Sequence, residues 1–157
     1  MKSRLPRLSV VLAVALAASL LGACGGSSGD ESGAVRASKP SAAVRSSAAV
    51  RLAESPAPLR ANVADADTLA GEGLAGLKAR LAKLKGHPVV VNQWASWCGP
   101  CRAEFPFFAD AVLAHGDEVA FLGIDTTDDR DAANMFLKQI PPGFASIYDP
   151  KGEAARS

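Results

Sequence analysis

The chain has 157 residues, a formal net charge of +1, a hydrophobic content of 48% and three cysteines. This length leaves room for one domain, and the nearly balanced charge gives no reason to expect nucleic acid or a strongly charged substrate as a partner. An odd number of cysteines in a secreted chain requires an explanation for the unpaired one.

The N-terminus has the pattern of an export signal. Three basic side chains precede an almost wholly apolar run over 8–23, which is short for a membrane-spanning helix of about 20 residues. The run ends in Leu-Leu-Gly-Ala before Cys24 and is similar to the bacterial lipobox, whose cysteine is lipidated and becomes the first residue after cleavage. The alternative is ordinary signal cleavage near Ala23, with Cys24 incidental. We predict a signal peptide over 1–23 and lipid attachment at Cys24.

The next segment, up to about residue 58, is rich in Gly, Ser, Ala and Pro with scattered charge. A short Ala-Val-Arg repeat recurs three times, at spacings that fit no solenoid. No face of this segment is apolar enough to offset the entropy lost on ordering. The sequence therefore predicts a lipidated, disordered tether over 24–58 and a folded domain over 59–157.

Helical and strand patterns alternate along the predicted domain. Leucines at helical spacing predict a packing helix over 74–84, and the valines at 89–91 suit a central strand covered on both faces that continues to Trp94. Further along, we expect a helix over about 98–115, a strand over 119–124, a helix over 130–139 and a strand over 144–148. Strands that alternate with helices predict an α/β fold with a parallel or mixed sheet.

Cys98 and Cys101 form a C-x-x-C pair between the strand that ends at Trp94 and the following helix. Unpaired amides and the helix dipole at a helix N-terminus favour a cysteine thiolate, which is the attacking species in disulfide exchange. The second cysteine is close enough to release the product. This pattern indicates a redox-active pair, with Cys98 as the nucleophile and Cys101 as the resolving thiol.

The segment PVVVNQWASWCGPCRAEFP, residues 88–106, resembles the thioredoxin superfamily and, within it, the membrane-tethered TlpA/ResA-like disulfide reductases. The weaker segment 119–156 fits the strand, helix and strand inserted in that subgroup. The resemblance implies a thioredoxin-like fold and a redox-active disulfide between Cys98 and Cys101. The residues expected to pack at or shape this site are Trp94, Trp97, Gly99, Pro100 and Pro106, with the two tryptophans acting as aromatic cover or as plain core.

Two positions favour TlpA/ResA-like proteins over cytoplasmic thioredoxins. Thioredoxins carry a buried Asp six residues before the first cysteine, where this chain has Asn92, which cannot take a proton. TlpA-like proteins have instead a Glu three residues after the second cysteine, which is Glu104 here. The resemblance implies that Glu104 accepts a proton from Cys101 or tunes the pair. A solvated surface Glu is the alternative.

The family also has a cis-proline loop opposite the cysteines, followed by two strands and a last helix. We expect this loop to lie beyond Ser157, so the fold is predicted to be incomplete at its C-terminus, and this stretch of chain to be marginally stable with an unpaired edge strand. The competing assignment places the cis-proline at Pro141 or Pro142.

The predicted function is that of an extracytoplasmic, membrane-tethered protein-disulfide reductase that needs no cofactor. The resemblance implies disulfide-bonded protein substrates, among them apocytochrome cysteines awaiting haem in cytochrome c maturation, and a membrane thiol carrier as the electron source. Three alternatives remain: a thiol oxidase of the same fold, a static structural disulfide, and a metal-binding module that combines Cys98 and Cys101 with His87 or His115. Structural zinc sites usually need four ligands, so no metal site is expected.

Overall fold

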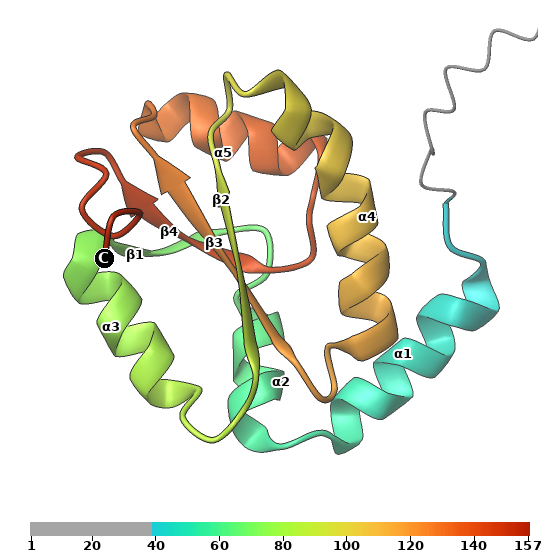
Figure 1. The fold of residues 1–157 in the computed structure, drawn as a ribbon. Helices are drawn as coiled ribbons and strands as arrows, with labels where there is room; N and C mark the ends of the chain where they lie inside the picture. Colours follow the sequence, from blue (N-terminus) through green and yellow to red (C-terminus); the bar gives the residue numbers. More distant parts are fainter. Residues whose placement is uncertain (1–38) are drawn as a thin grey trace, which may run out of the picture. The chain divides into compact units, whose positions relative to one another are not determined.

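The computed structural model describes residues 39–157, which contain four strands and five helices (Figure 1). The strands are β1 (Leu69–Glu72), β2 (Val89–Trp94), β3 (Ala120–Thr126) and β4 (Ala145–Asp149). The helices are α1 (Ala42–Glu54), α2 (Ala57–Ala64), α3 (Gly73–Lys83), α4 (Gly99–His115) and α5 (Arg130–Gln139).

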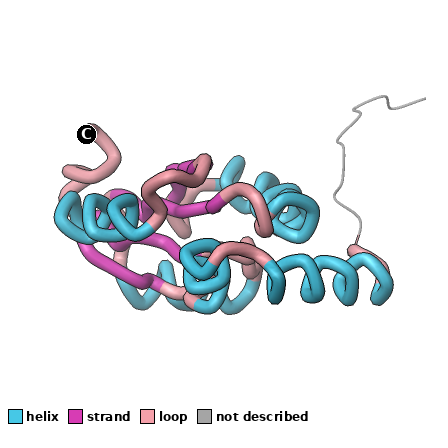
Figure 2. The backbone as a smooth tube through the Cα atoms, turned by 90° about the horizontal axis from the view of Figure 1, so that it is seen from below, coloured by secondary structure: helices cyan, strands magenta, loops and turns pink. Residues whose placement is uncertain are grey.

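All four strands are parallel and form one sheet in the order β1-β4-β3-β2. Helix α3 covers one face, where Leu77 packs with Ile124 and Ile147. Helices α4 and α5 cover the other face, which carries Trp94 and Phe121. A view at right angles to the first shows the strands running between the helices (Figure 2). This is the predicted α/β architecture, and a parallel sheet needs such cover on both faces.

The six elements predicted from residue 74 onward are all present, with ends within three residues of the expected positions. Local chemistry explains two of these ends. Helix α5 begins behind Asp129, whose carboxylate accepts hydrogen bonds from the amides of Asp131 (3.0 Å) and Ala132 (2.9 Å). The chain turns after α3 at Gly86, whose φ of +94° lies in the region that glycine adopts without strain.

The N-terminal helices were not predicted. The sequence predicted a disordered tether up to residue 58, and within the described residues this is wrong, because α1 occupies Ala42–Glu54 and packs against α4. Ala48 is 1% exposed, so a helix of mostly small side chains gains its burial from a partner far along the chain. Helix α2 is also held by a residue far along the chain, because Asn62 donates a hydrogen bond to the Phe121 carbonyl on β3 (2.9 Å).

Strand β2 was predicted to be central and covered on both faces, and this is wrong within residues 39–157. The strand pairs with β3 on one side only and forms an edge of the sheet. Val90 and Val91 are 41% and 45% exposed, so neither face of β2 is fully covered at these positions. Within the described part of the chain, β2 therefore presents unpaired backbone groups and two apolar side chains directly before the cysteine motif.

An aromatic cluster joins α4 and α5 to the sheet. The ring of Phe105, which is 0% exposed, lies 5.2 Å from that of Trp94, 4.9 Å from that of Phe136 and 5.9 Å from that of Phe144, measured between centroids. Edge-to-face and stacked pairs at these separations stabilise a core beyond the area that they bury. The cluster therefore fixes the first turns of α4 on the sheet.

The predicted signal peptide and Cys24 lie outside the described residues. Within 39–157, no helix has the length and apolar character needed to cross a membrane. Every peptide bond in the same range is trans, including those before Pro141 and Pro142.

Candidate active site

The two cysteines lie where β2 passes into α4. Cys98 is the residue that caps α4, and Cys101 is in its first turn. The Sγ atom of Cys98 accepts a hydrogen bond from the Cys101 amide at 3.3 Å, and a disulfide joins the two residues, whose Cα atoms are 5.4 Å apart. The site is thus at the carboxyl edge of a parallel sheet, the usual place for chemistry in such folds.

The two sulfurs differ in access. Cys98 is half-buried, whereas Cys101 is 9% exposed and packs among Trp94, Phe105 and Phe136. The amide that points at the Cys98 sulfur is one of the donors that a helix N-terminus leaves without an intrahelical partner, and it would also bond a thiolate. Cys98 is therefore the more accessible residue of the pair.

The two tryptophans of the motif have different surroundings. Trp94 is 1% exposed, and its indole N–H donates to the Ser146 hydroxyl at 3.0 Å, so it belongs to the core. Trp97 is 69% exposed and stands beside Cys98 with its indole N–H donating to the Thr127 carbonyl at 3.2 Å. Of the two tryptophans, only Trp97 is exposed beside the cysteine pair.

The other residues expected to shape the site lie on α4. Gly99 and Pro100 are the first two residues of the helix and are exposed. Pro100 suits this place, because its missing N–H would have no intrahelical partner there and its φ is already helical. Pro106 lies inside α4 and is half-buried.

The structure places Asn92 and Glu104 in different environments. The Nδ2 atom of Asn92 is buried and has no hydrogen-bond partner among the residues that the structure describes. Glu104 is exposed on α4, one turn beyond Cys101, and its carboxylate takes part in none of the hydrogen bonds or ion pairs found in residues 39–157. Glu104 therefore faces solvent, while the thiol that it was expected to serve is buried.

The described part of the chain contains no group of three or more His, Cys, Asp or Glu side chains placed to share a metal ion. His87 lies in the turn before β2, where its amide bonds the Leu84 carbonyl (3.1 Å), and His115 is the last residue of α4. The site carries two sulfurs at one end of α4 and an imidazole at the other, so the metal-binding alternative gains no support.

Comparison with known proteins decides the family. The model of the AhpC/TSA family matches residues 63–157, which is more than half of the chain. This chain belongs to the AhpC/TSA family. The match covers β1 to β4 and includes both cysteines of the motif.

Curated relatives of this family member carry names of thiol–disulfide exchange proteins. The chain is 29% identical over 86 residues to the thiol-disulfide oxidoreductase ResA of Bacillus subtilis (strain 168), covering 54% of this chain and 48% of ResA. It is 34% identical over 105 residues to the thiol:disulfide interchange protein CycY of Rhizobium leguminosarum bv. viciae, covering 66% and 55%. It is 38% identical over 69 residues to the thiol:disulfide interchange protein DsbE of Escherichia coli (strain K12), covering 43% and 36%.

These matches confirm the predicted resemblance to ResA-like proteins, although the chain spans only about half the length of the relatives, or less. Among solved structures, that of MTB dsbF in its mixed oxidized and reduced forms is 26% identical, with a TM-score of 0.46, 65% of this chain covered and 70% of the other.

The structure of this AhpC/TSA family member also contains a site component that the sequence did not reveal. The loop after β3 lies against the loop before Cys98, and the Asp128 carboxylate accepts hydrogen bonds from the backbone N–H and the hydroxyl of Ser96. The sequence pattern predicted only a turn with helix caps there. One sequence signal could have indicated this contact. Ser96 and Asp128 are polar residues that follow two strands, and residues that follow neighbouring parallel strands lie at the same edge of the sheet.

Asp125 lies behind this contact, on β3. It stands opposite Trp94 on β2 and Tyr148 on β4 and is 0% exposed, and within residues 39–157 neither of its carboxylate oxygens has a hydrogen-bond partner. Burial raises the pKa of Asp125 to about 8, and the neighbouring Asp128 adds to the rise while Arg130 opposes it. The Asp125 carboxyl is therefore mostly protonated at neutral pH.

Proposed function

We propose that this protein is a thiol–disulfide oxidoreductase that reduces disulfides in other proteins, with Cys98 as the nucleophile and Cys101 as the resolving thiol. One observation carries the proposal: a reachable sulfur caps the N-terminus of α4 and is bonded to a second, buried sulfur. The names of the relatives support the same chemistry.

The proposed reaction transfers two electrons from the reduced cysteine pair to the substrate. The Cys98 thiolate attacks one sulfur of the substrate disulfide, whose S–S bond breaks, and the departing thiolate takes up a proton. Cys101 then loses its proton and attacks Cys98 Sγ, which releases the second substrate thiol and forms the Cys98–Cys101 disulfide. A dithiol donor must reduce the pair again, and we propose a membrane thiol carrier for this role.

Replacement of each cysteine tests the assignment. In an insulin-reduction assay driven by dithiothreitol, we expect Cys98→Ser to lose the acceleration and Cys101→Ser to accumulate a mixed disulfide that mass spectrometry detects. Cys24→Ser is the matched control and should keep the wild-type rate. The assignment is wrong if Cys98→Ser reduces insulin as fast as the wild type.

The direction of electron flow is a separate question. The Cys-Gly-Pro-Cys sequence is that of thioredoxin, whose potential is about −270 mV, whereas a strong oxidant such as DsbA lies near −120 mV. We expect a glutathione redox titration to give a value close to that of thioredoxin. A value near the oxidant's would make the protein a thiol oxidase.

We further propose that Glu104 carries the Cys101 proton to solvent. Its position one turn beyond Cys101, with its carboxylate exposed, allows exchange with water, while the buried thiol has no such access. Glu104→Gln should slow the step in which Cys101 attacks, with less effect on the attack by Cys98. Equal rates of the Cys101 step in Glu104→Gln and the wild type would leave Glu104 a surface residue.

The location proposed for this chemistry is the extracytoplasmic face of a bacterial cell membrane. The support is the signal-like segment and the lipobox-like Leu-Leu-Gly-Ala before Cys24. Expression with a radiolabelled fatty acid should label the wild type and not Cys24→Ala. Label of equal strength in both proteins would exclude Cys24 as the attachment site.

A further inference from the structure

The segment before Cys98 is held from the side by the loop that follows β3. Ser96 donates its hydroxyl to Asp128 Oδ1 at 2.9 Å and its amide to Asp128 Oδ2. Trp97 donates its indole N–H to the carbonyl of Thr127 at 3.2 Å. Cys98 itself donates its amide to the Ala95 carbonyl at 3.1 Å. The position of the Cys98 backbone therefore depends on a loop that lies 30 residues further along the chain.

Asp128 is itself held in place by two further hydrogen bonds. Its carbonyl accepts a hydrogen bond from the Tyr148 hydroxyl at 3.1 Å, so β4 holds it from one side. Its Oδ1 atom also accepts from the Asp129 amide at 2.8 Å, and Asp129 caps α5. Bonds to a charged acceptor are about twice as strong as neutral ones, so two such bonds to Ser96 hold it in one geometry.

The charges around this anchor come from three elements. Asp125 on β3 and Asp149 on β4 carry like charge when ionised, and Arg130 on α5 carries the opposite charge, its guanidinium lying 4.1 Å from the centre of the Tyr148 ring. Burial raises the pKa of Asp125 to about 8, so Asp125 is mostly protonated at neutral pH, and it is Asp128 whose carboxylate oxygens accept the bonds from Ser96.

We propose that Asp128 is a positioning residue for disulfide exchange, which acts through Ser96 to hold Cys98 in line with Cys101. The proposal deepens the proposed function and rests on Cys98 and Cys101 exchanging a disulfide. The step that depends on it is the intramolecular one, in which the Cys101 thiolate attacks Cys98 Sγ and expels the substrate sulfur. Misplacement of reacting atoms by about 1 Å can slow such a step by about a hundredfold.

The test isolates that step on the full chain. Reduced protein is mixed with oxidised glutathione, which forms a mixed disulfide at Cys98, and the rate at which Cys101 expels glutathione is followed by acid quenching and mass spectrometry. We expect Asp128→Ala to slow expulsion by about tenfold or more, while the rate of mixed-disulfide formation changes by less than about twofold. Asp131→Ala, an exposed aspartate in the first turn of α5, is the matched control and should leave both rates unchanged.

Three further variants keep the test decisive. Asp128→Asn retains one acceptor oxygen and should restore part of the rate. Ser96→Ala removes only the hydroxyl bond, so it should give an intermediate loss even where Asp128→Ala folds poorly. The double variant Ser96→Ala with Asp128→Ala should be no slower than Asp128→Ala alone, because both changes remove the same contact.

Expulsion within twofold of the wild type in a folded Asp128→Ala or Ser96→Ala protein would overturn the proposal, as would additive losses in the double variant. A loss that follows the melting temperature, and is equal for both exchange steps, would show a purely structural role and also overturn it. Because glutathione is the probe, these outcomes do not depend on whether the protein reduces protein substrates. The insulin assay tests that function independently.

Discussion

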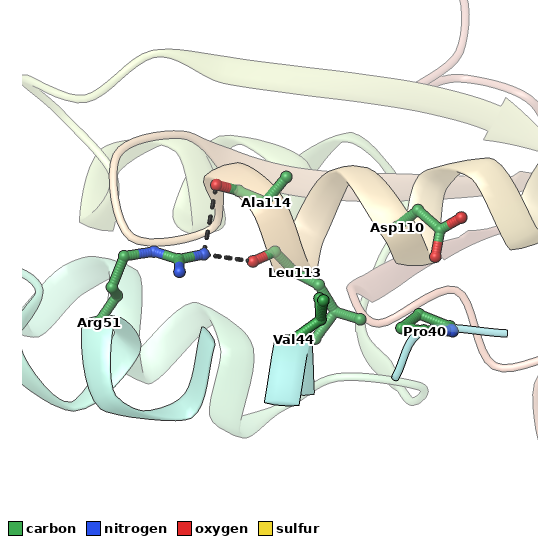
Figure 3. Close-up of a pocket in the computed structure, with 6 residues that line it drawn as sticks. All are labelled: Pro40, Val44, Arg51, Asp110, Leu113 and Ala114. Atoms are coloured by element: carbon green, nitrogen blue, oxygen red, sulfur yellow. Dashed lines mark hydrogen bonds between the residues drawn. The ribbon is translucent and has the colours of Figure 1, made fainter. Parts of the chain in front are cut away.

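The backbone groups left without helical partners at the two ends of α4 are bonded in different ways. Every helix leaves unpaired carbonyls at its C-terminus and unpaired amides at its N-terminus. At the C-terminal end, Arg51 of α1 donates to the carbonyls of Leu113 (2.6 Å) and Ala114 (3.4 Å), as Figure 3 shows, and pairs with Asp117 at 3.4 Å. At the N-terminal end, the Cys101 amide points at the Cys98 sulfur.

This difference suggests that the C-terminal end of α4 serves stability and that its N-terminal end, with Cys98, serves the proposed chemistry. The chain supplies a permanent cation to the C-terminal carbonyls, and α1 packs beside them around a pocket of about 400 Å³ lined by Pro40, Val44, Arg51, Asp110, Leu113 and Ala114 (Figure 3). At the other end, the partner of the amide is the Cys98 sulfur, which under the proposed function gains and loses charge with each redox cycle. Changes at the first end should alter stability, and changes at the second should alter exchange chemistry.

The largest expected effect comes from the middle of α4, which supports both ends. Phe105→Ala removes a ring that is 0% exposed and packs against three other aromatic rings. We expect a loss of about 3–5 kcal/mol in the free energy of unfolding, measured by urea denaturation. A loss below about 1 kcal/mol would show that the aromatic cluster does not hold α4 on the sheet.

The second prediction concerns the pH dependence near the reactive end. The pKa of Asp125 is raised from 3.8 to about 8, so above pH 4 the unfolded chain gives up a proton that the folded chain keeps. The stability that this group contributes is therefore lost as pH rises towards 8, by at most about 1.4 kcal/mol per pH unit. Asp125→Asn should show a shallower decline between pH 5 and pH 8 in denaturant titrations. Parallel profiles for the two proteins would contradict the raised pKa.

The third prediction tests the structural end directly. Arg51→Ala removes two bonds to carbonyls and a partly exposed ion pair, so we expect a loss of about 1–2 kcal/mol in unfolding free energy and an unchanged rate of disulfide exchange. Lys78→Ala on the exposed side of α3 is the control and should change stability by less than about 0.5 kcal/mol. If disulfide exchange were slower in Arg51→Ala while its unfolding free energy were unchanged, the C-terminal end of α4 would not have a purely structural role.

The smallest effect is expected for Trp97→Phe, which keeps the aromatic ring and removes the N–H that bonds Thr127. We expect a loss of about 0.5–1 kcal/mol in thermal or urea unfolding, because the bond is largely exposed to water. A loss above about 2 kcal/mol would mean that Trp97 contributes to the core, contrary to its 69% exposure.

Local patterns made most of the folded domain predictable. Apolar spacing, glycine and proline stops, and the Asp129 cap mark the elements from α3 to β4, and the cysteine spacing marks the reactive end of α4. These signals act within a few residues of the chain, so they are visible without knowledge of the fold.

What could not be predicted depends on distant partners. The α1 segment has no strongly apolar face, and its order follows from contacts such as that between Arg51 and Leu113, 62 residues apart. The Ser96–Asp128 bonds join two loops that come together only when β2 and β3 pair. The edge position of β2 depends on the order of the strands in the sheet. A run of valines predicts a strand but carries no information about that order.

The contrast between Trp94 and Trp97 gives the protein its own optical reporter. The chain contains two tryptophans, one sealed in the core and one 69% exposed beside the Cys98–Cys101 disulfide. Their emission should separate into a blue-shifted and a red-shifted component, and a quencher dissolved in water should reach only the second. If the Cys98–Cys101 bond opens and closes as proposed, the fluorescence of this neighbouring indole should report the oxidation state of the pair without an added label.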